Sequence, residues 1–246
     1  MSSVCMIIPC FNEATRLPTD VFMTYLHRVE MVRVCFVNDG SRDNTRAVLE
    51  SLHQQLPAQI EVLNLAQNVG KAGAVRAGML HCADQPVDYL GYLDADLATP
   101  LDAIGDLQTV LDQHPSLELV MGSRIKYLGV DIRRDPFRNY VGRVIATLIS
   151  NILKLPVYDT QCGAKMLRRG VVPGLFDEPF ISPWLFDVEL LARLIRQHGR
   201  PNMPQHVAEV PLRQWIEQSD SRISSTYIFK MWFELYRIHQ TYRDAG

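Results

Sequence analysis

Short apolar runs alternate with helix-like stretches through the first half of the chain. Each run is apolar on both of its faces, which is typical of a strand inside a parallel sheet. Strands that alternate with helices favour a sheet covered by helices on both sides. We therefore predict an α/β fold with a mostly parallel central sheet flanked by helices. The predicted strands are Val4–Ile8, Val32–Val37, Ile60–Leu63, Tyr89–Leu93 and Leu117–Met121, and the predicted helices are 18–29, 43–55, 71–83 and 100–112.

The alternation ends after residue 122, and the second half has a different pattern. Asn139–Leu155 predicts a mostly apolar helix, Phe186–His198 a second helix, and Val207–Leu212 a strand. Residues 225–242 predict an amphipathic C-terminal helix. The sequence shows no repeat, low-complexity tract or clear linker, so we expect a single domain over residues 1–246.

The composition is ordinary for a soluble globular protein, and it excludes several classes. The chain has 246 residues and a net charge of −2, which gives no sign of a nucleic-acid partner. No apolar run approaches the roughly 18–20 residues that would cross a bilayer. The five cysteines and seven histidines show no zinc-ligand spacing, and we expect Cys5 and Cys35 to be small buried hydrophobes. No signal-peptide pattern is present, so we expect a reducing, cytoplasmic environment.

One window is locally basic although the chain as a whole is slightly acidic. Residues 123–143 contain six basic and two acidic side chains. The sequence leaves open whether this window is a solvated surface loop or an anion site. The basic residues are Arg124, Lys126, Arg133, Arg134, Arg138 and Arg143.

Polar residues follow three of the predicted strands at the point where each strand ends. They occupy residues 9–13, 38–41 and 94–96. The carboxyl ends of parallel strands meet at one edge of a sheet, where α/β folds bind their ligands. We therefore expect these three clusters to form one site.

Asp94 and Asp96 provide two carboxylates at the end of a predicted strand. In an extended segment residues i and i+2 point the same way, so the two side chains would form a claw for Mg²⁺ or Mn²⁺. The alternative is that they cap a helix that begins near Pro100.

Lys71 lies near the start of a predicted helix that follows the third strand. Gly70-Lys71 lacks the flanking residues of a P-loop, and the glycines at 70, 73 and 78 do not fit the dinucleotide spacing. A cation is unfavourable at a helix N-terminus, so Lys71 indicates a functional requirement. Asp39 is placed to accept hydrogen bonds from a base or ribose, and Asp43 to cap the helix 43–55.

Taken together, these motifs resemble the family 2 glycosyltransferases of GT-A fold, and most closely the dolichyl-phosphate β-glucosyltransferases. The likeness covers roughly residues 4–225. The sequence has Phe11, Asn38 and Ala164 where that family usually has Tyr, Asp and Phe. The resemblance rests on Pro9…Asn12-Glu13, Asn38-Asp-Gly-Ser-x-Asp43-x-Thr45, Asn68-x-Gly70-Lys71, Asp94-Ala95-Asp96-Leu-Ala-Thr-Pro100, Gly122-Ser-Arg124, Asp159-Thr-Gln-Cys-Gly163-x-Lys165, Phe186-Asp-x-Glu189 and Glu209-Val-Pro-Leu-Arg-x-Trp215.

The resemblance implies a nucleotide-sugar donor that is bound by the N-terminal half of the chain, residues 1–122. Asp94 would serve the ribose or a metal-bound water, Asp96 would ligate Mg²⁺ or Mn²⁺ directly, and Arg124 would hold phosphate. The donor-binding set it implies is Pro9, Phe11, Asn12, Glu13, Asp39, Lys71, Asp94, Ala95 and Asp96.

An acceptor-binding half over residues 123–225 is implied in the same way. If the acceptor is a lipid phosphate, it is mostly dianionic at pH 7 because its second pKa is about 6, and cations matter more than a base. The cations are Arg124, Arg134, Arg138 and Lys165. If the acceptor is a hydroxyl, a carboxylate must take its proton. Asp159 is that candidate, with Asp187 and Glu189 behind it, although Asp159 could instead orient Lys165.

The function expected from the resemblance is inverting, metal-dependent transfer of glucose from UDP-glucose to a polyprenyl phosphate such as dolichyl or undecaprenyl phosphate. The alternatives are GDP-mannose or a UDP-N-acetylhexosamine as donor, a soluble hydroxyl acceptor, or a non-catalytic nucleotide-sugar-binding protein. To meet a lipid acceptor, helix 139–155 and the C-terminal segment 226–246 would lie on the cytoplasmic face of a membrane, beside the basic window. The alternative, which the sequence leaves open, is that both helices pack on the sheet or on each other. A homo-oligomer or a membrane-protein partner stays open.

Overall fold

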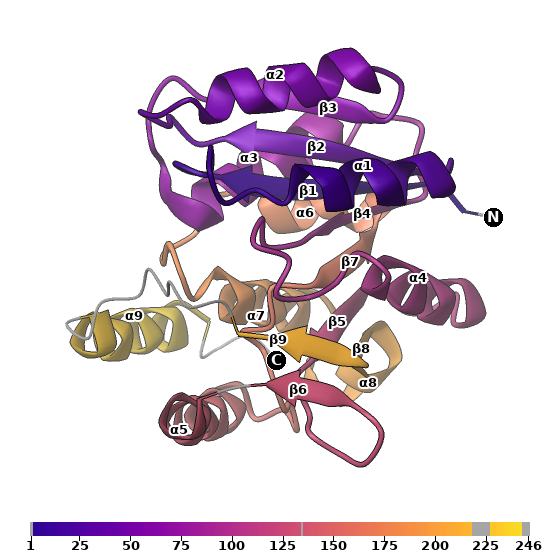
Figure 1. Ribbon diagram of the computed structural model, residues 1–246. Helices are drawn as coiled ribbons and strands as arrows, with labels where there is room; N and C mark the ends of the chain where they lie inside the picture. Colours follow the sequence, from indigo (N-terminus) through magenta and orange to yellow (C-terminus); the bar gives the residue numbers. More distant parts are fainter. Residues whose placement is uncertain (1, 134, 218–226, 243–246) are drawn as a thin grey trace.

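The computed structural model describes residues 2–133, 135–217 and 227–242, apart from the side chains of 136–138 and 227–229. Its centre is a seven-stranded sheet with the strand order β3-β2-β1-β4-β7-β5-β8 (Figure 1). Both halves of the sequence contribute strands to this one sheet. The strands are β1 Val4–Cys10, β2 Val32–Asn38, β3 Ile60–Asn64, β4 Tyr89–Tyr92, β5 Leu119–Ser123, β7 Lys165–Arg168 and β8 Val207–Pro211.

The predicted mostly parallel sheet is confirmed. Strands β1, β2, β3 and β4 pair in parallel, as do β5 and β8. Strand β1 is buried almost throughout, which explains why its sequence is apolar at successive positions rather than at alternate ones.

Strand β7 was not predicted, and it runs against the rest of the sheet. It pairs antiparallel with β4 on one side and with β5 on the other. Because its direction is reversed, the start of β7 lies at the edge where the parallel strands end. The loop that precedes Lys165 is thereby brought to the same edge as the polar clusters after β1, β2 and β4.

Helices cover both faces of the sheet. Helices α1, α2 and α4 pack with one hydrophobic cluster, and α3, α6 and α7 pack with the other. The predicted helices in the first half are confirmed, with boundaries that differ by a few residues. The bounds are α1 Thr19–Arg28, α2 Thr45–Gln55, α3 Gly70–Cys82, α4 Ala103–Gln113, α6 Val172–Phe176, α7 Phe186–His198 and α8 Met203–His206.

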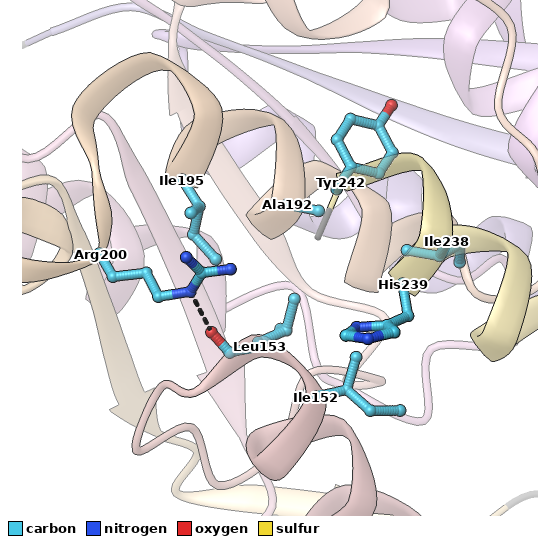
Figure 2. Close-up of a pocket in the computed structure, with 8 residues that line it drawn as sticks. All are labelled: Ile152, Leu153, Ala192, Ile195, Arg200, Ile238, His239 and Tyr242. Carbon is cyan, nitrogen blue, oxygen red and sulfur yellow. Dashed lines mark hydrogen bonds between the residues drawn. The ribbon is translucent and has the colours of Figure 1, made fainter. Parts of the chain in front are cut away.

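Two further helices, α5 (Pro136–Leu153) and α9 (Tyr227–Tyr242), pack against α7 and against each other. Helix α9 buries Met231, Leu235 and Ile238, which recur at helical spacing. Figure 2 shows the small pocket at the junction of the three helices, where the Arg200 side chain donates a hydrogen bond to the Leu153 carbonyl at 3.1 Å. The predicted C-terminal amphipathic helix is confirmed within the described residues.

A small second sheet lies beside the main one. It consists of β6 (Asp131–Arg133) and β9 (Gln214–Ile216), which pair in parallel. Its pairing places Trp215 next to Ile132, and both side chains are buried. The pairing therefore ties the basic window to the segment that follows β8. No helix among the described residues is long and apolar enough to cross a membrane.

Candidate functional site

The loops after β1 and β2 are joined by hydrogen bonds at the carboxyl edge of the sheet. Asn12, which has a positive φ of 53°, donates its N–H to Ser41 Oγ at 3.0 Å and accepts from the Arg42 N–H at 2.9 Å. The Glu13 N–H donates to Thr45 Oγ1 at 2.7 Å. These contacts bring two of the three predicted polar clusters together and hold their backbones in a fixed arrangement.

Pro9 and Phe11 flank the end of β1, and Asp43 lies before α2 in the neighbouring loop. Pro9 is near the end of β1, and Phe11 follows the strand, half-buried. The Asp43 carboxylate accepts a hydrogen bond from the Thr45 N–H at 3.0 Å and so satisfies a donor at the start of α2. The N-cap residue of α2 is Asn44, which makes no side-chain cap bond, so Asp43 contributes from one residue before the cap.

Asp39 anchors the start of helix α3. Its carboxylate accepts hydrogen bonds from the N–H groups of Val69 at 2.7 Å and Gly70 at 3.0 Å, and from the Asn68 side chain at 2.9 Å. Burial raises the pKa of Asp39, and the two backbone N–H groups oppose that shift. The contact between Asp39 and a nucleoside stays a prediction, but the structure adds a structural role that the sequence did not indicate.

Gly40 explains how the β2 loop can approach α3 so closely. Its φ is +60°, and a Cβ at this position would lie 2.5 Å from the backbone nitrogen of Asn68. Only glycine fits both the conformation and the space. The glycine therefore permits the contact between Asp39 and the helix start.

Lys71 forms an ion pair with Asp94, with 2.5 Å between Nζ and Oδ1. Burial would lower the pKa of Lys71, but the carboxylates of Asp94, Asp187 and Asp96 outweigh burial and raise it. The unfavourable position of a cation at a helix N-terminus thus has an explanation in the structure. Lys71 carries a positive charge to the end of β4.

The two carboxylates after β4 lie together, but not in the predicted extended conformation. Strand β4 ends at Tyr92, and Asp94–Leu97 form a turn in which the Leu97 N–H donates to the Asp94 carbonyl at 3.2 Å. The expectation that an extended segment aligns the pair is therefore wrong. Asp96 Oδ1 accepts the Ala98 N–H at 3.0 Å, and the intervening Ala95 is buried.

The electrostatics of this turn favour a bound cation. Burial raises the pKa of Asp96, and the neighbouring Asp94 raises it further, while the Ala98 N–H and Lys71 oppose the shift. The negative charges of Asp94 and Asp96 repel each other, and a divalent cation bound between them would remove this repulsion. Both side chains offer only oxygen ligands, as Mg²⁺ and Mn²⁺ prefer. The residues present therefore fit a divalent metal site.

Gly163 packs directly against Asp94. A Cβ at position 163 would lie 2.0 Å from Asp94 Oδ2 and 2.5 Å from its carboxyl carbon. Gly163 belongs to the loop that precedes the antiparallel strand β7. The loop's backbone therefore forms one wall of the carboxylate site, which the sequence alone did not indicate.

Arg124 and Asp159 form a bidentate ion pair at the end of β5. Arg124 Nε donates to Oδ2 and Nη2 to Oδ1, each at 2.7 Å, and the Arg124 backbone N–H adds a third bond at 3.0 Å. Burial would raise the pKa of Asp159, but Arg124 outweighs burial and lowers it. The same guanidinium lies 5.2 Å from the centre of the Trp215 ring.

The backbone around Asp159 is held from two sides. Glu209 accepts the N–H groups of Tyr158 and Asp159, each at 2.7 Å. Arg143, from the basic window, donates to the Tyr158 carbonyl at 2.8 Å and lies 3.6 Å from the centre of its ring. Arg143 therefore fixes this loop in place.

Lys165 does not lie where the acceptor-phosphate prediction requires. Its side chain is fully buried, and Nζ lies 2.7 Å from Asp187 Oδ1. It also donates to the carbonyls of Thr160 at 2.9 Å and Cys162 at 2.7 Å. The prediction that Lys165 binds an acceptor phosphate is wrong, because an ammonium group with these partners and no exposure cannot reach a ligand. It instead fixes the loop that carries Gly163.

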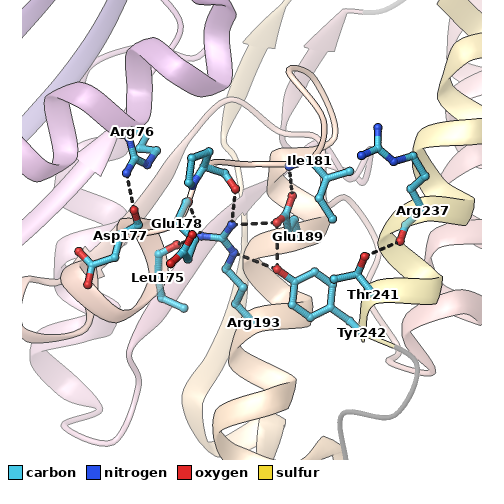
Figure 3. Close-up of polar contacts among 11 residues, drawn as sticks. Arg76, Leu175, Asp177, Glu178, Ile181, Glu189, Arg193, Arg237, Thr241 and Tyr242 are labelled. Carbon is cyan, nitrogen blue, oxygen red and sulfur yellow. Dashed lines mark hydrogen bonds and ion pairs between the residues drawn. The ribbon is translucent and has the colours of Figure 1, made fainter.

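Asp187 and Glu189, the other two candidates for a base, are also engaged in ion pairs. Asp187 is paired with Lys165, as described above. Figure 3 shows Glu189 accepting from Arg193 at 2.8 Å, from the Tyr242 hydroxyl at 2.9 Å and from the Ile181 N–H at 2.8 Å. Arg193 donates further to three backbone carbonyls of residues 175, 178 and 179. Glu189 thus holds α7, α9 and the loop before α7 together.

Two of the predicted acceptor-binding cations cannot be placed. Arg134 and the side chain of Arg138 lie outside the described residues. Their role at an acceptor stays a prediction.

The match between this chain and a protein-family model identifies its class of enzyme. The model of the glycosyl transferase family 2 matches residues 5–176, which include all of β1 but its first residue, both carboxylates of the turn, Arg124 and Asp159. The chain belongs to glycosyl transferase family 2. It is therefore a glycosyltransferase, as the motifs predicted.

Curated relatives of this glycosyltransferase share most of its length. A dolichyl-phosphate beta-glucosyltransferase of Trichomonas vaginalis, ALG5C, is 32% identical over 244 residues, which is 94% of this chain and 69% of the relative. The dolichyl-phosphate beta-glucosyltransferase of Saccharomyces cerevisiae is 30% identical over 241 residues, which is 89% of this chain and 68% of the relative.

Solved structures confirm the GT-A fold. The UDP complex of glucosyl-3-phosphoglycerate synthase from Mycobacterium tuberculosis has a TM-score of 0.70 at 16% identity, with 97% of this chain and 80% of that chain covered. Mannosyl-3-phosphoglycerate synthase from Rubrobacter xylanophilus also has a TM-score of 0.70, at 15% identity, with 96% and 72% covered. At these identities the likeness concerns the fold alone.

Proposed function

We propose that this glycosyltransferase transfers glucose from UDP-glucose to a polyprenyl phosphate, with inversion at the anomeric carbon and with a divalent metal at Asp94 and Asp96. The proposal is supported by relatives that are named dolichyl-phosphate beta-glucosyltransferases and that match nearly the whole chain. It is carried by one observation in the site, the ion pair between the partly exposed Arg124 and the buried Asp159.

The ion pair favours a phosphate acceptor over a hydroxyl acceptor. A hydroxyl needs a general base, and a useful base has a pKa near the working pH. The pKa of Asp159 is instead lowered, and both of its oxygens are bonded to Arg124. Asp187 and Glu189 are committed to Lys165 and Arg193. A polyprenyl phosphate is mostly dianionic at pH 7, since its second pKa is about 6, and it can attack without losing a proton.

The donor would bind at the carboxyl edge between the β1, β2 and β4 loops. Asp39, Phe11 and Glu13 would face the nucleoside, and Asp96 would hold the metal with Asp94. When bound, Mg²⁺ or Mn²⁺ would neutralise the charge that develops on the departing diphosphate. Mn²⁺ and UDP-glucose occur together in a solved complex of the mycobacterial glucosyl-3-phosphoglycerate synthase, which supports this assignment. Lys71 would add a second positive charge beside the diphosphate.

Arg124 would position the acceptor phosphate. Its Nε and one Nη2 hydrogen are directed to Asp159, and the remaining N–H groups of its planar guanidinium can bind phosphate. Asp159 would then act by orienting Arg124, which is the structural alternative to its predicted role as a base. The Trp215 ring on one side of the guanidinium further restricts its orientation.

The acceptor lipid would be presented by a membrane surface beside α5 and α9. Large apolar side chains are exposed on both helices, Tyr140 on α5 and Trp232, Phe233 and Tyr236 on α9. Aromatic side chains are favoured at the boundary between lipid and water. We therefore place the enzyme peripherally at the cytoplasmic face of a membrane, next to the basic window at residues 123–143.

An acceptor panel tests the proposal. Purified enzyme with Mg²⁺ or Mn²⁺ would be given UDP-glucose and either a short polyprenyl phosphate or the matching polyprenol, which carries a hydroxyl in place of the phosphate. We expect glucosylated lipid only from the phosphate. Transfer to the polyprenol or to a soluble alcohol, abolished in Asp159→Asn, would show that Asp159 is a base and would overturn the proposed acceptor class. GDP-mannose and UDP-N-acetylglucosamine, tested in parallel, would reveal a different donor.

A further inference from the structure

Three cysteines that are far apart in the sequence meet on one face of the sheet. Cys5 lies on β1, Cys35 on β2 and Cys82 at the end of α3, and all three are buried. The strand register explains why these side chains are neighbours. Cys35 on β2 is paired with Ile7 on β1 and with Glu61 on β3. Cys5 lies two residues before Ile7 and therefore on the same face. Helix α3 covers this face and brings Cys82 onto it.

The side chains of this group converge closely enough to contact one bound ion. The Sγ atoms of Cys35 and Cys82 and a carboxylate oxygen of Glu61 all lie within 4.8 Å of one another. Cys5 lies on the same face, and the pKa values of the Cys5 and Cys35 thiols are both raised, with the neighbouring Cys82 as the largest cause. The cluster therefore combines three sulfur atoms and one carboxylate oxygen, which we call the thiol cluster.

Polar neighbours orient the carboxylate of the thiol cluster. His81 Nε2 lies 2.5 Å from Glu61 Oε1, and Gln85 Nε2 donates to Glu61 Oε2 at 2.6 Å and to Cys82 Sγ at 3.7 Å. Partners of this kind commonly fix the orientation of metal ligands. A cavity of about 280 Å³ adjoins the cluster and is lined by Cys5, Glu61, Gln85, Arg33 and His53.

Two sulfur atoms and one carboxylate oxygen that lie within 4.8 Å of one another are ligands of the type that four-coordinate Zn²⁺ uses, and Cys5 lies beside them on the same face of the sheet. Zinc binds thiolate sulfur at about 2.3 Å and carboxylate oxygen at about 2.0–2.2 Å in four-coordinate sites. At those bond lengths, tetrahedral geometry places two sulfur ligands roughly 3.7 Å apart, and the Cys35 and Cys82 sulfur atoms lie within 4.8 Å of each other. Buried cysteines that serve only as small hydrophobes need no carboxylate among them. Glu61 and its polar partners are what distinguish this cluster from such packing.

We propose that Cys35, Cys82 and Glu61 form a binding site for a thiophilic divalent cation of the Zn²⁺ class, with the neighbouring Cys5 available as a fourth ligand. Binding would replace the thiol protons, which are released to solvent as the sulfur atoms become metal-bound thiolates. The site is separate from the donor site, because Lys71 and Cys82 stand near opposite ends of α3, about 16 Å apart at 1.5 Å per residue. A bound cation would tie β1, β2, β3 and α3 together.

Cadmium provides a direct probe, because its bonds to thiolates give an ultraviolet charge-transfer absorption that carboxylate ligands do not produce. Reduced protein would be titrated with Cd²⁺, and bound Cd²⁺ would then be displaced with Zn²⁺. We expect absorption that saturates at one equivalent and that is lost in Cys82→Ala. In Glu61→Gln, the affinity should fall by about 10–100-fold, as for other weakened metal sites. Cys10→Ala, a buried cysteine outside the cluster, should match the wild-type protein.

Two controls keep the test decisive. Asp96→Asn removes a carboxylate of the donor site and should leave the cadmium absorption unchanged, so failure of one site is distinguishable from failure of the other. If Cys82→Ala does not fold, Glu61→Gln decides, because Glu61 is only half-buried and keeps its shape as Gln. No saturable absorption in the wild-type protein, or equal affinity in wild type and Glu61→Gln, would overturn the proposal.

Discussion

Replacing Gly163 by alanine should damage the donor site without unfolding the protein. A Cβ at this position would lie 2.0 Å from Asp94 Oδ2, whereas real Cβ contacts are essentially never shorter than 3.0 Å. Either the loop before β7 or the Asp94 carboxylate must therefore move by at least about 1 Å, and a displacement of that size can cost roughly 100-fold in rate. The Asp94 side chain is 40% exposed and has space to rotate away, so stability should change little.

The assay is steady-state transfer with UDP-glucose as the varied substrate, together with the dependence of rate on Mn²⁺. We expect kcat/KM to fall by about 100-fold in Gly163→Ala, which corresponds to roughly 2.7 kcal/mol of transition-state stabilisation. Gly170→Ala is the matched control, because it lies in the segment that follows β7 and an added Cβ there has no atom within 4 Å. It should behave as the wild-type enzyme does.

A double-mutant cycle can refute the reasoning. If the damage comes from the contact with Asp94, Gly163→Ala should cost little further activity in an Asp94→Ala background, because the contacting atoms are gone. Equal losses in both backgrounds would show that the alanine acts elsewhere. Activity of Gly163→Ala close to that of the wild type would show that the loop does not form a wall of the site.

Three further outcomes follow from the contacts described. Arg193→Ala should lower the free energy of urea unfolding by about 3–5 kcal/mol, because it removes the cation that pairs with the buried Glu189, and a loss below about 1 kcal/mol would contradict this. Gly105→Ala, in α4 with nothing near the added Cβ, should raise the unfolding free energy by about 0.5–1 kcal/mol, and a decrease would argue against the open helical site. Arg124 lowers the pKa of Asp159 in the folded protein. The ion pair therefore stabilises the fold above the unfolded-state pKa of about 3.9, and this stabilisation is lost as the pH falls through the folded-state pKa of Asp159. The difference in unfolding free energy between wild type and Asp159→Asn should therefore shrink from pH 7 to acidic pH, whereas a constant difference would contradict the ion pair.

The parallel part of the sheet could be predicted because burial on both faces leaves a local signal. Strand β1 is apolar at successive positions, and its neighbours β2 and β4 share that pattern. The polar residues at the strand ends could also be predicted to form one site, because parallel strands end at a common edge of the sheet.

Strand β7 could not be predicted because its burial depends on a distant partner. The strand begins at Lys165, which reads as an exposed residue in sequence, and only the ion pair with Asp187 allows that ammonium group to be fully buried. The same distant pairing makes Lys165 unable to bind a phosphate. The thiol cluster was missed for a similar reason, because strand register and α3 bring together cysteines that show no metal spacing along the chain.

The most direct test of the proposed reaction follows label from donor to lipid. Radiolabelled UDP-glucose would be incubated with Mn²⁺, a short polyprenyl phosphate and either wild-type enzyme or Asp96→Asn, and the organic phase would be counted. We predict metal-dependent label in the lipid with the wild-type enzyme and a loss of at least about 100-fold in Asp96→Asn. Absence of lipid label from the wild-type enzyme, under conditions in which UDP binds, would contradict transfer to a polyprenyl phosphate.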